Sequence, residues 1–338
     1  MTTERPLAPS RFMRETQNRP GGGRHRAALV EKARLSIKQG SKSFSAASRL
    51  FDKPTRERVW LLYAWCRRCD DIADAQEMGG ELGDQSNPEG RLNSIRALTQ
   101  RAFEGLPTAD VAFDAFGLVA QECGITPEMA EDVIAGFALD AKDWRPRSER
   151  NLLQYCYHVA GAVGVMMAVV MGVDPEDQET LDRATDLGLA FQLANIARDL
   201  VEDDAAGRCY LPMEWLAYQD IEPGQHTKPH HRQELADMAA QLTDLMEQHA
   251  AASKIGAAKL PFRSRWAVLS AARIYTAIGR EVRARGTAAW DHRVYTSKTD
   301  KMRHAAAAFF EALLNRPQAP AEMPEWSRRQ LAEKARSA

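Results

Sequence analysis

Two acid-rich segments of the chain hold the residue types and spacings best suited to chemistry. The first, ERVWLLYAWCRRCDDIAD at residues 57–74, has the composition of one helix. At 100° per residue, one narrow stripe of that helix contains Tyr63, Arg67, Asp70 and Asp74, with Asp71 just beside it. Aspartates at i and i+4 repel each other on a helix. A divalent cation would offset that repulsion, although an exposed acidic helix face would explain the same pattern.

The second segment, DLGLAFQLANIARDLVEDD at residues 186–204, repeats the arrangement. Its polar stripe consists of Gln192, Asn195, Asp199 and Asp203, flanked by Glu202, and apolar residues occupy the other faces. Polar side chains this dense within an apolar helix need partners. Two such helices facing each other across a cavity could hold Mg²⁺, which prefers oxygen ligands and bridges to phosphates. A set of oxygen ligands alone argues against zinc or copper.

Cationic and aromatic residues accompany both acidic stripes. The candidates for binding the phosphate groups of a metal-bound substrate are Lys42 in GSKSF, Arg67, Arg198, and Arg208 with Tyr210 in GRCYLP. Taken singly, each cation is more often a surface charge. Their placement beside the acidic stripes favours the phosphate-binding interpretation.

The first segment also offers a rival chemistry, because WCRRC imitates the WCxxC motif of redox proteins. In those proteins the motif lies where a strand meets a helix N-terminus, whose dipole lowers the thiol pKa. Here it lies deep within a predicted helix. We therefore expect Cys66 and Cys69 to be packing residues and the carboxylates to carry the chemistry. The five cysteines are odd in number and scattered, as expected of reduced thiols.

Helices must position these residues. The chain has 338 residues, 44% of them apolar, and from about residue 28 to 315 its periodicity is helical with almost no β-branched alternation. Clusters of Gly, Pro and Asn predict breaks near residues 79–90, 105–107, 124–127, 142–150, 172–177 and 222–230. The sequence thus predicts an all-α fold with one domain at 28–315. We expect a disordered polar tail at 1–27 and a Pro-rich tail at 316–338, in which a final exposed helix could form.

Charge and hydropathy restrict the partners. With 45 basic and 46 acidic side chains the net charge is −1, so no nucleic-acid partner is expected. The first 26 residues contain no apolar segment of a secretory signal, and an Arg-rich transit peptide is a weaker alternative. The apolar run Val159–Val173 is too short to span a bilayer and predicts a buried helix. HTKPHH at 226–231 is interpreted as a solvated loop rather than a metal site.

Three motifs, in order and at suitable separations, resemble those of a known family. They are DDIAD at 70–74, YCYHVAGAVG at 155–164 and QLANIARDLVEDDAAGRCYLP at 192–212. Over about residues 40–290 the chain is similar to the head-to-head isoprenyl diphosphate synthases, the squalene and phytoene synthases, and most of all to their bacterial phytoene-forming members. The resemblance implies the all-α isoprenoid synthase fold, a helical bundle around a deep central cavity. The Ala and Gly residues of the apolar run would leave room for prenyl chains, permit close helix packing, or do both.

The same motifs imply roles for individual residues. The implied ligands of Mg²⁺ or Mn²⁺ are Asp70, Asp74, Asp199 and Asp203, with Asp71 and Asn195 assisting. The implied diphosphate contacts are Ser41, Lys42, Tyr63, Arg67, Arg198, Arg208 and Tyr210, whereas Tyr155 and Gln192 would lie along the cavity. Catalysis would fall to the four principal aspartates with Arg67 and Tyr63. A helix N-cap and a surface charge are equally good interpretations of Ser41 and Lys42. Phe137 stands where many relatives have Met, and Asp140 is retained.

The resemblance implies a prenyl transfer reaction. Two molecules of geranylgeranyl diphosphate would condense head to head, through prephytoene diphosphate, to phytoene, which is the first committed step of carotenoid biosynthesis. An alternative within the family is a squalene or dehydrosqualene synthase acting on farnesyl diphosphate, because residue spacing does not fix substrate length. An alternative of another class is a catalytically silent helical lipid carrier or scaffold, which the retention of all four aspartates disfavours.

The expected location follows from the chemistry of the implied substrate. Because substrate and product are lipids, we expect a cytoplasmic protein with peripheral membrane contact through an apolar cavity mouth. The sequence leaves open which surface faces the bilayer, the oligomeric state and the base that removes the final proton.

Overall fold

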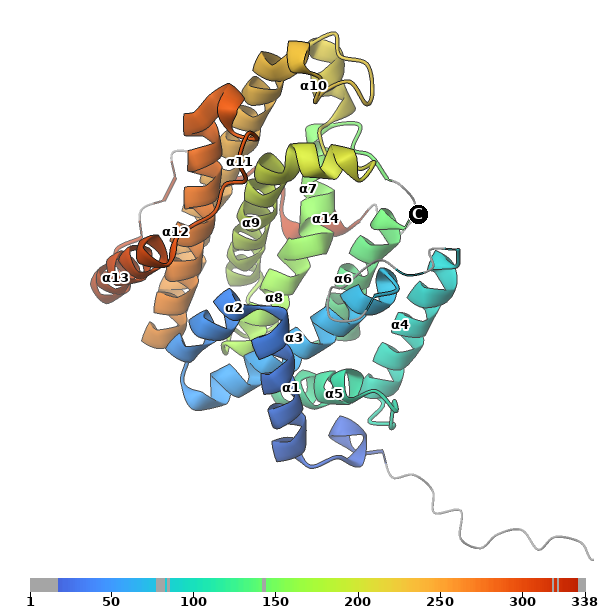
Figure 1. Ribbon diagram of the computed structural model, residues 1–338. Coiled ribbons are helices and arrows are strands. Elements are labelled where there is room, and N and C mark those ends of the chain that lie inside the picture. Colours follow the sequence, from blue (N-terminus) through green and yellow to red (C-terminus); the bar gives the residue numbers. More distant parts are fainter. Residues whose placement is uncertain are drawn as a thin grey trace, which may run out of the picture.

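The computed structural model describes residues 18–76, 83, 86–141, 144–317, 319–320 and 322–333. Within these residues all regular structure is helical, which confirms the predicted fold class. One half of the molecule is built on α9 (Gln178–Ala205), which packs against α8 (Ala162–Val170), α11 (Arg232–Lys259) and α12 (Phe262–Arg285). Figure 1 shows α9 in the middle of the molecule, with α11 and α12 on one side of it.

The N-terminal helices form the other half. They are α1 (Arg26–Gly40), α3 (Lys53–Ala73), α4 (Pro88–Phe103), α5 (Val111–Cys123) and α6 (Pro127–Asp140). In this half α3 packs between α1 and α5, and α4 packs against α5 and α6. The two halves share one large core of buried apolar side chains, so α3 and α9, the two acid-bearing helices, belong to the same domain.

Shorter elements connect these helices. They are η1 (Pro20–Gly23), α2 (Lys42–Ala47), η2 (Ser48–Leu50), α7 (Glu149–Cys156), η3 (Tyr157–Gly161), α10 (Met213–Tyr218), η4 (Pro229–His231), η5 (Gly286–Ala288), α13 (Lys298–Leu314) and α14 (Arg328–Ala332). The elements α7, η3 and α8 form one continuous helix in which η3 is a π-helical turn. Such turns insert one extra residue per turn and often occur at functional sites.

Capping residues set where the helices begin. The side chains of Asp52, Thr126, Asp177 and Ser297 accept hydrogen bonds from the first turns of α3, α6, α9 and α13. The predicted breaks that fall on described residues lie between helices. Further breaks were not predicted. They lie on either side of α2, between α9 and α10, between α11 and α12, and between α12 and α13. Between α11 and α12 a single Pro261 disfavours helix at the residue before it.

The predicted buried helix is present and packs closely on α9. A Cβ atom on Gly188 would lie 2.5 Å from the carbonyl oxygen of Ala160, and one on Gly164 would lie 2.6 Å from that of Ala184. Only glycine therefore permits this approach of the two helices. The continuous helix Glu149–Val170 is long and apolar enough to cross a membrane, but 72% of its most apolar window is buried inside the protein. It is a core helix in this structure.

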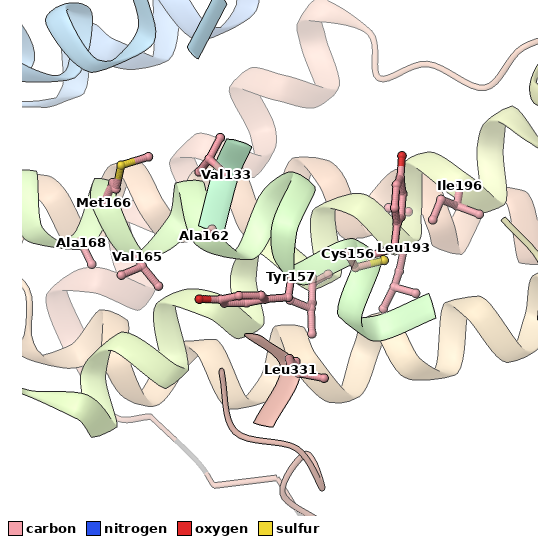
Figure 2. Close-up of a cluster of buried hydrophobic side chains, with 14 of the residues drawn as sticks. Val133, Cys156, Tyr157, Ala162, Val165, Met166, Ala168, Leu193, Ile196 and Leu331 are labelled. Carbon is pink, nitrogen blue, oxygen red and sulfur yellow. The ribbon is translucent and has the colours of Figure 1, made fainter. Parts of the chain in front are cut away.

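The C-terminal helix is more buried than the sequence predicts. Leu331 of α14 is only 1% exposed, and Figure 2 shows it lying beside Tyr157 of η3. Just before α14, the Trp326 ring lies 4.3 Å from the guanidinium carbon of Arg150. The expectation of an exposed final helix is therefore wrong, because its apolar residues cover the continuous helix instead of facing water.

The N-terminal segment also contacts the folded body. Arg24 donates to Asp114 at 2.7 Å, and Gly21 is buried against Leu29. The predicted disorder of residues 1–27 is therefore wrong for residues 18–27, which include η1 and the start of α1. Residues 1–17 lie outside the described part of the chain, and there it stays a prediction.

Candidate functional site

The first acidic stripe lies in the last turns of α3. Arg67 donates to Asp70 at 2.9 Å and pairs with Asp71 at the same distance, from one turn earlier on the same helix. Asp71 is only 4% exposed, whereas the Asp70 side chain is 42% exposed. Asp74 is the C-cap of the helix and accepts from Gln76 at 2.6 Å. Asp70 therefore faces outward and Asp71 faces inward, and both carboxylates pair with the guanidinium of Arg67.

The GSKSF segment passes directly over the aromatic end of this stripe. A Cβ atom on Gly40 would lie 2.5 Å from the Tyr63 hydroxyl oxygen, and the rings of Phe44 and Tyr63 are 5.6 Å apart. Ser41 accepts a hydrogen bond from the Phe44 amide at 3.2 Å, so it caps α2, as its alternative interpretation proposed. The side chain of Lys42 lies outside the described part of the structure. Burial raises the pKa of Tyr63, which keeps its hydroxyl protonated.

The second acidic stripe lies near the C-terminal end of α9. Gln192, Asn195, Asp199 and Asp203 are all half-buried, while the apolar residues between them, except the partly buried Val201, are buried in the core. Arg198 donates to Asp199 at 2.8 Å. A second guanidinium reaches the same carboxylate: Arg293, from the segment between α12 and α13, lies 2.9 Å from it.

Arg208 connects the two stripes. It follows α9, and its charge lowers the pKa of Asp70 on α3 and of Asp203 on α9, so it lies within electrostatic reach of both. Burial acts in the opposite direction and is the largest cause at both carboxylates. The pKa of Asp203 is raised to about 6, with nearby Asp199 contributing, and that of Asp70 is also raised. The fold thus brings the two acidic helix ends to one cationic residue.

An aromatic stack adjoins Arg208. Tyr155 of α7 stacks on Tyr210 at 4.7 Å and on Trp144 at 5.5 Å between ring centroids. Both tyrosine hydroxyls point at Asp140, at the end of α6, with distances of 3.0 Å from Tyr155 and 3.5 Å from Tyr210. Burial raises the pKa of Asp140 to about 6 and that of Tyr210 to about 12. Asp140 therefore lies where α6, α7 and the segment after α9 meet.

The donor set fits a divalent cation only with help from a substrate. Asp70, Asp74, Asp199, Asp203 and Asn195 offer oxygen ligands, the type that Mg²⁺ and Mn²⁺ bind. Within the described ranges, however, no three acidic, His or Cys side chains are close enough together to hold one metal ion. Mg²⁺ usually takes one or two carboxylates and completes its shell with water and substrate phosphates. The arrangement is therefore suited to a metal that arrives with a diphosphate, and the metal and diphosphate roles stay predictions.

Several features escaped the sequence interpretation. Arg293 belongs to no acidic stripe, and its segment lies just beyond the motifs that suggested the family. The resemblance noted Asp140 without a role, which the two tyrosine contacts supply. His226 was expected in a solvated loop but is 1% exposed and lies 3.8 Å from Asp204, so that expectation is wrong for this residue.

The rejection of the redox motif agrees with the structure. Burial raises the pKa of the Cys66 thiol to about 12 and raises that of Cys69 as well. A redox-active thiol needs the opposite shift. All five cysteines are free.

Comparisons with known proteins agree with this geometry. The family model described as squalene/phytoene synthase matches residues 37–300. The chain is 46% identical to a phytoene synthase of Pseudescherichia vulneris, over 83% of this chain and 91% of that protein. It is 43% identical to a 15-cis-phytoene synthase of Pantoea ananas, over 89% and 98% of the two chains. The crystal structure of a dehydrosqualene synthase in complex with a ligand superposes with a TM-score of 0.75, at 26% identity and over 86% and 98% of the two chains.

Proposed function

The chain belongs to the squalene/phytoene synthase family, and from that premise we propose that it is a 15-cis-phytoene synthase that joins two molecules of geranylgeranyl diphosphate. The observation that carries this proposal is the 42–46% identity to phytoene synthases over at least 81% of the chain. Proteins of this family condense two prenyl diphosphates, so the protein is a prenyltransferase. The substrate length and the metal are the specific parts of the proposal.

In the first step, the C–O bond of one substrate breaks and inorganic diphosphate leaves with its electron pair. The allylic cation that remains is attacked by the double bond of the second substrate, and loss of a proton closes the cyclopropane ring of prephytoene diphosphate. The residues that would bind the leaving diphosphate are Arg67, Arg198, Arg208 and Tyr63. Fixed cations beside a developing negative charge lower the barrier because they need no reorganisation during the reaction.

In the second step, prephytoene diphosphate loses its own diphosphate, and its carbon skeleton rearranges. Loss of one proton then gives the central triene of phytoene, so no hydride donor is needed. Trp144 and Tyr210 cover the ring of Tyr155, so within this stack it is the outer π-face of Tyr210 that could stabilise a carbocation. Asp140 holds both hydroxyls and so would fix the orientation of the two rings.

The family generally depends on a divalent metal, and we propose Mg²⁺ or Mn²⁺ here. When bound, the metal would neutralise diphosphate charge and so make it a better leaving group. Asp70 and Asp74 at the end of α3 and Asn195, Asp199 and Asp203 on α9 would hold it. Their carboxylates would exchange part of their present contacts with Arg67, Arg198 and Arg293 for the incoming cation.

The test is identification of the hydrocarbon product. Purified protein with Mg²⁺ or Mn²⁺ is offered geranylgeranyl or farnesyl diphosphate, with and without NADPH, and the hydrocarbons are extracted and identified. The expected result is phytoene from the C20 substrate without NADPH. Squalene or a C30 triene from the C15 substrate would move the protein to a neighbouring activity of its family. No product under any condition would contradict the enzyme assignment and favour a carrier or scaffold.

A further inference from the structure

The helix α13 has an unusually apolar outer side. Its inner side packs on α12: Ala308 and Ala312 are fully buried, and Trp266 of α12 donates to the Ala305 carbonyl at 2.8 Å. Figure 1 shows α13 at the edge of the molecule, outside α12. On the outer side, Met302, Phe310, Leu313 and Leu314 are 62–66% exposed. We call these four residues the α13 face.

The α13 face is a continuous stripe rather than a set of scattered side chains. Its members are separated by eight, three and one residues, with Ala306 exposed between Met302 and Phe310, so they share one side of the helix. In the described part of the chain, six large apolar side chains are more than 60% exposed, and five of them lie between Tyr295 and Leu314. Contiguous exposed apolar surface of this kind marks an interaction site.

The surroundings of this stripe are basic. From Phe262 to Arg316 there are eleven Lys and Arg but four Asp and Glu, although the whole chain has a net charge of −1. Three of the eleven, Arg280, Arg283 and Arg293, pair with acids outside this segment. Four of these cations lie on α13 or just after it: Lys298, Lys301, Arg303 and Arg316. Of the two acids on α13, Glu311 pairs with Lys254 at 2.9 Å and with Arg273, and Asp300 pairs with Arg303 at 3.3 Å. The four cations therefore still outnumber the two acids on and just after this helix.

We propose that the α13 face docks the protein onto an anionic lipid bilayer. Apolar side chains on one face of a surface helix, rimmed by Lys and Arg, match the acyl boundary and the anionic headgroups of such a bilayer. A second copy of the chain is a poorer partner, because a two-fold contact would place the same cations against each other. Our sequence interpretation expected membrane contact through a cavity mouth, and this inference assigns it to α13 instead.

The inference rests on the proposed function in one respect: a C40 hydrocarbon product needs a lipid phase to receive it. The residues between α12 and α13 also connect the two sites. This segment carries Arg293, which pairs with Asp199 at 2.9 Å, and α13 begins five residues later. A helix docked on the bilayer would thus hold one wall of the reaction site close to the membrane.

Flotation with lipid vesicles tests the proposal. The full chain is mixed with vesicles of phosphatidylcholine alone or of phosphatidylcholine with phosphatidylglycerol, at low and high salt. The test variant is Phe310→Ser with Leu313→Ser. The matched control is Met213→Ser with Tyr218→Ser, which removes two exposed apolar side chains from α10. Because all four side chains are exposed, both variants should keep the melting temperature of the wild type.

We expect the wild type and the α10 control to float with the anionic vesicles, less at high salt, and not with phosphatidylcholine alone. The α13 variant should lose at least about tenfold in vesicle partitioning. The proposal is overturned if the α13 variant floats like the wild type, if the wild type stays soluble, or if it binds both vesicle types equally. A wild-type dimer that the α13 variant splits, with vesicle binding unchanged, would also overturn it.

A separate assay in detergent micelles distinguishes this proposal from the proposed function. If the proposed function holds, wild type and both variants form hydrocarbon there at similar rates. Absence of hydrocarbon from all three proteins would count against the proposed function, while the flotation result would stand unaffected.

Discussion

The carboxylates at the ends of α3 and α9 are neutralised by arginines in two different ways. Both α3 and α9 place carboxylates near the C-terminal end of a helix, where the backbone dipole disfavours negative charge. On α3 the neutralising cation is Arg67 of the same helix, one turn before Asp70 and Asp71. On α9 the carboxylate of Asp199 is shared by its neighbour Arg198 and by Arg293 from a distant segment.

The contact of Arg67 with Asp71 on α3 is fixed, whereas the contact of Arg293 with Asp199 on α9 is adaptable. The Arg67 side chain is 19% exposed, and it holds a buried carboxylate from within a rigid helix. The Arg293 side chain is 58% exposed and comes from a segment without regular structure. We infer that α3 presents a preorganised half of the site, whereas the α9 half can exchange its outer guanidinium when a metal diphosphate binds.

The largest effect is expected from removing one carboxylate from either half. Asp70→Ala and Asp199→Ala should each lower turnover by about 10³-fold, because carboxylates of both halves would be needed to hold the metal that neutralises the leaving diphosphate. Steady-state rates with geranylgeranyl diphosphate measure this, and circular dichroism checks helicity. Glu202→Ala is the matched control, since it removes an exposed carboxylate from the same turn of α9 as Asp199. A normal rate for either Asp variant would remove that residue from the site.

The second prediction concerns stability and separates the two guanidiniums. Arg67→Ala removes the cation that neutralises buried Asp71 and should lower the free energy of unfolding by about 2–3 kcal/mol. The loss is less than for a fully buried pair because the Arg67 side chain is 19% exposed. Arg293→Ala breaks a largely exposed pair and should cost less than about 1 kcal/mol. Urea denaturation of the metal-free variants tests both. Equal losses would show that the two halves do not differ in rigidity.

The third prediction uses pH and concerns Asp140, between the two halves. Because burial raises its pKa from 3.8 to about 6, the folded state binds the proton more tightly than the unfolded chain does. The stability that this adds is present below the unfolded pKa and is lost as pH rises through about 6. Asp140→Asn should therefore be more stable than the wild type at pH 7.5, by about 1–2 kcal/mol, and by less at pH 4.5.

Chemical denaturation of the metal-free proteins at both pH values measures this difference. Asn keeps an oxygen that can accept from Tyr155, so the contact itself survives the substitution. The same stability difference at both pH values would exclude Asp140 as the source of the pH dependence.

The smallest effect is expected at the thiols of the first segment. Cys66→Ala should keep the rate within about twofold, because a thiol whose pKa is about 12 has almost no thiolate at neutral pH. Reaction with iodoacetamide at pH 7.5 should likewise be slow in the folded wild type. Loss of most activity in this variant would revive the redox interpretation.

Contacts between side chains could be predicted from the sequence where both partners lie on one helix. The spacing of Arg67, Asp70 and Asp71 specifies their contacts, because residues three and four apart on a helix are neighbours. Helical periodicity likewise specified the all-α fold. By contrast, the pairing of Arg293 with Asp199 depends on how α12 and the following segment fold back on α9, which local periodicity does not encode.

Other differences have the same physical origin. The burial of Leu331 and His226 depends on tertiary packing of segments whose composition is typical of exposed loops and tails. In the sequence, Asp140 simply lies at the end of a predicted helix. Its contacts with the hydroxyls of Tyr155 and Tyr210 depend on how α6, α7 and the segment after α9 pack together. The break at Pro261 was not predicted because breaks were predicted from clusters of Gly, Pro and Asn, and a single proline does not form such a cluster.

The most direct test of the two-sided site is the melting temperature of the protein with its smallest ligands. Inorganic diphosphate and Mg²⁺ are added singly and together to the wild type, to Asp70→Asn and to Asp199→Asn. A ligand bound only by the native state at a hundred times its Kd stabilises it by about 2.7 kcal/mol. We predict a clear rise for the wild type only when both are present, and its loss in either variant. The same rise in a variant, or none in the wild type, would contradict a site formed jointly by α3 and α9.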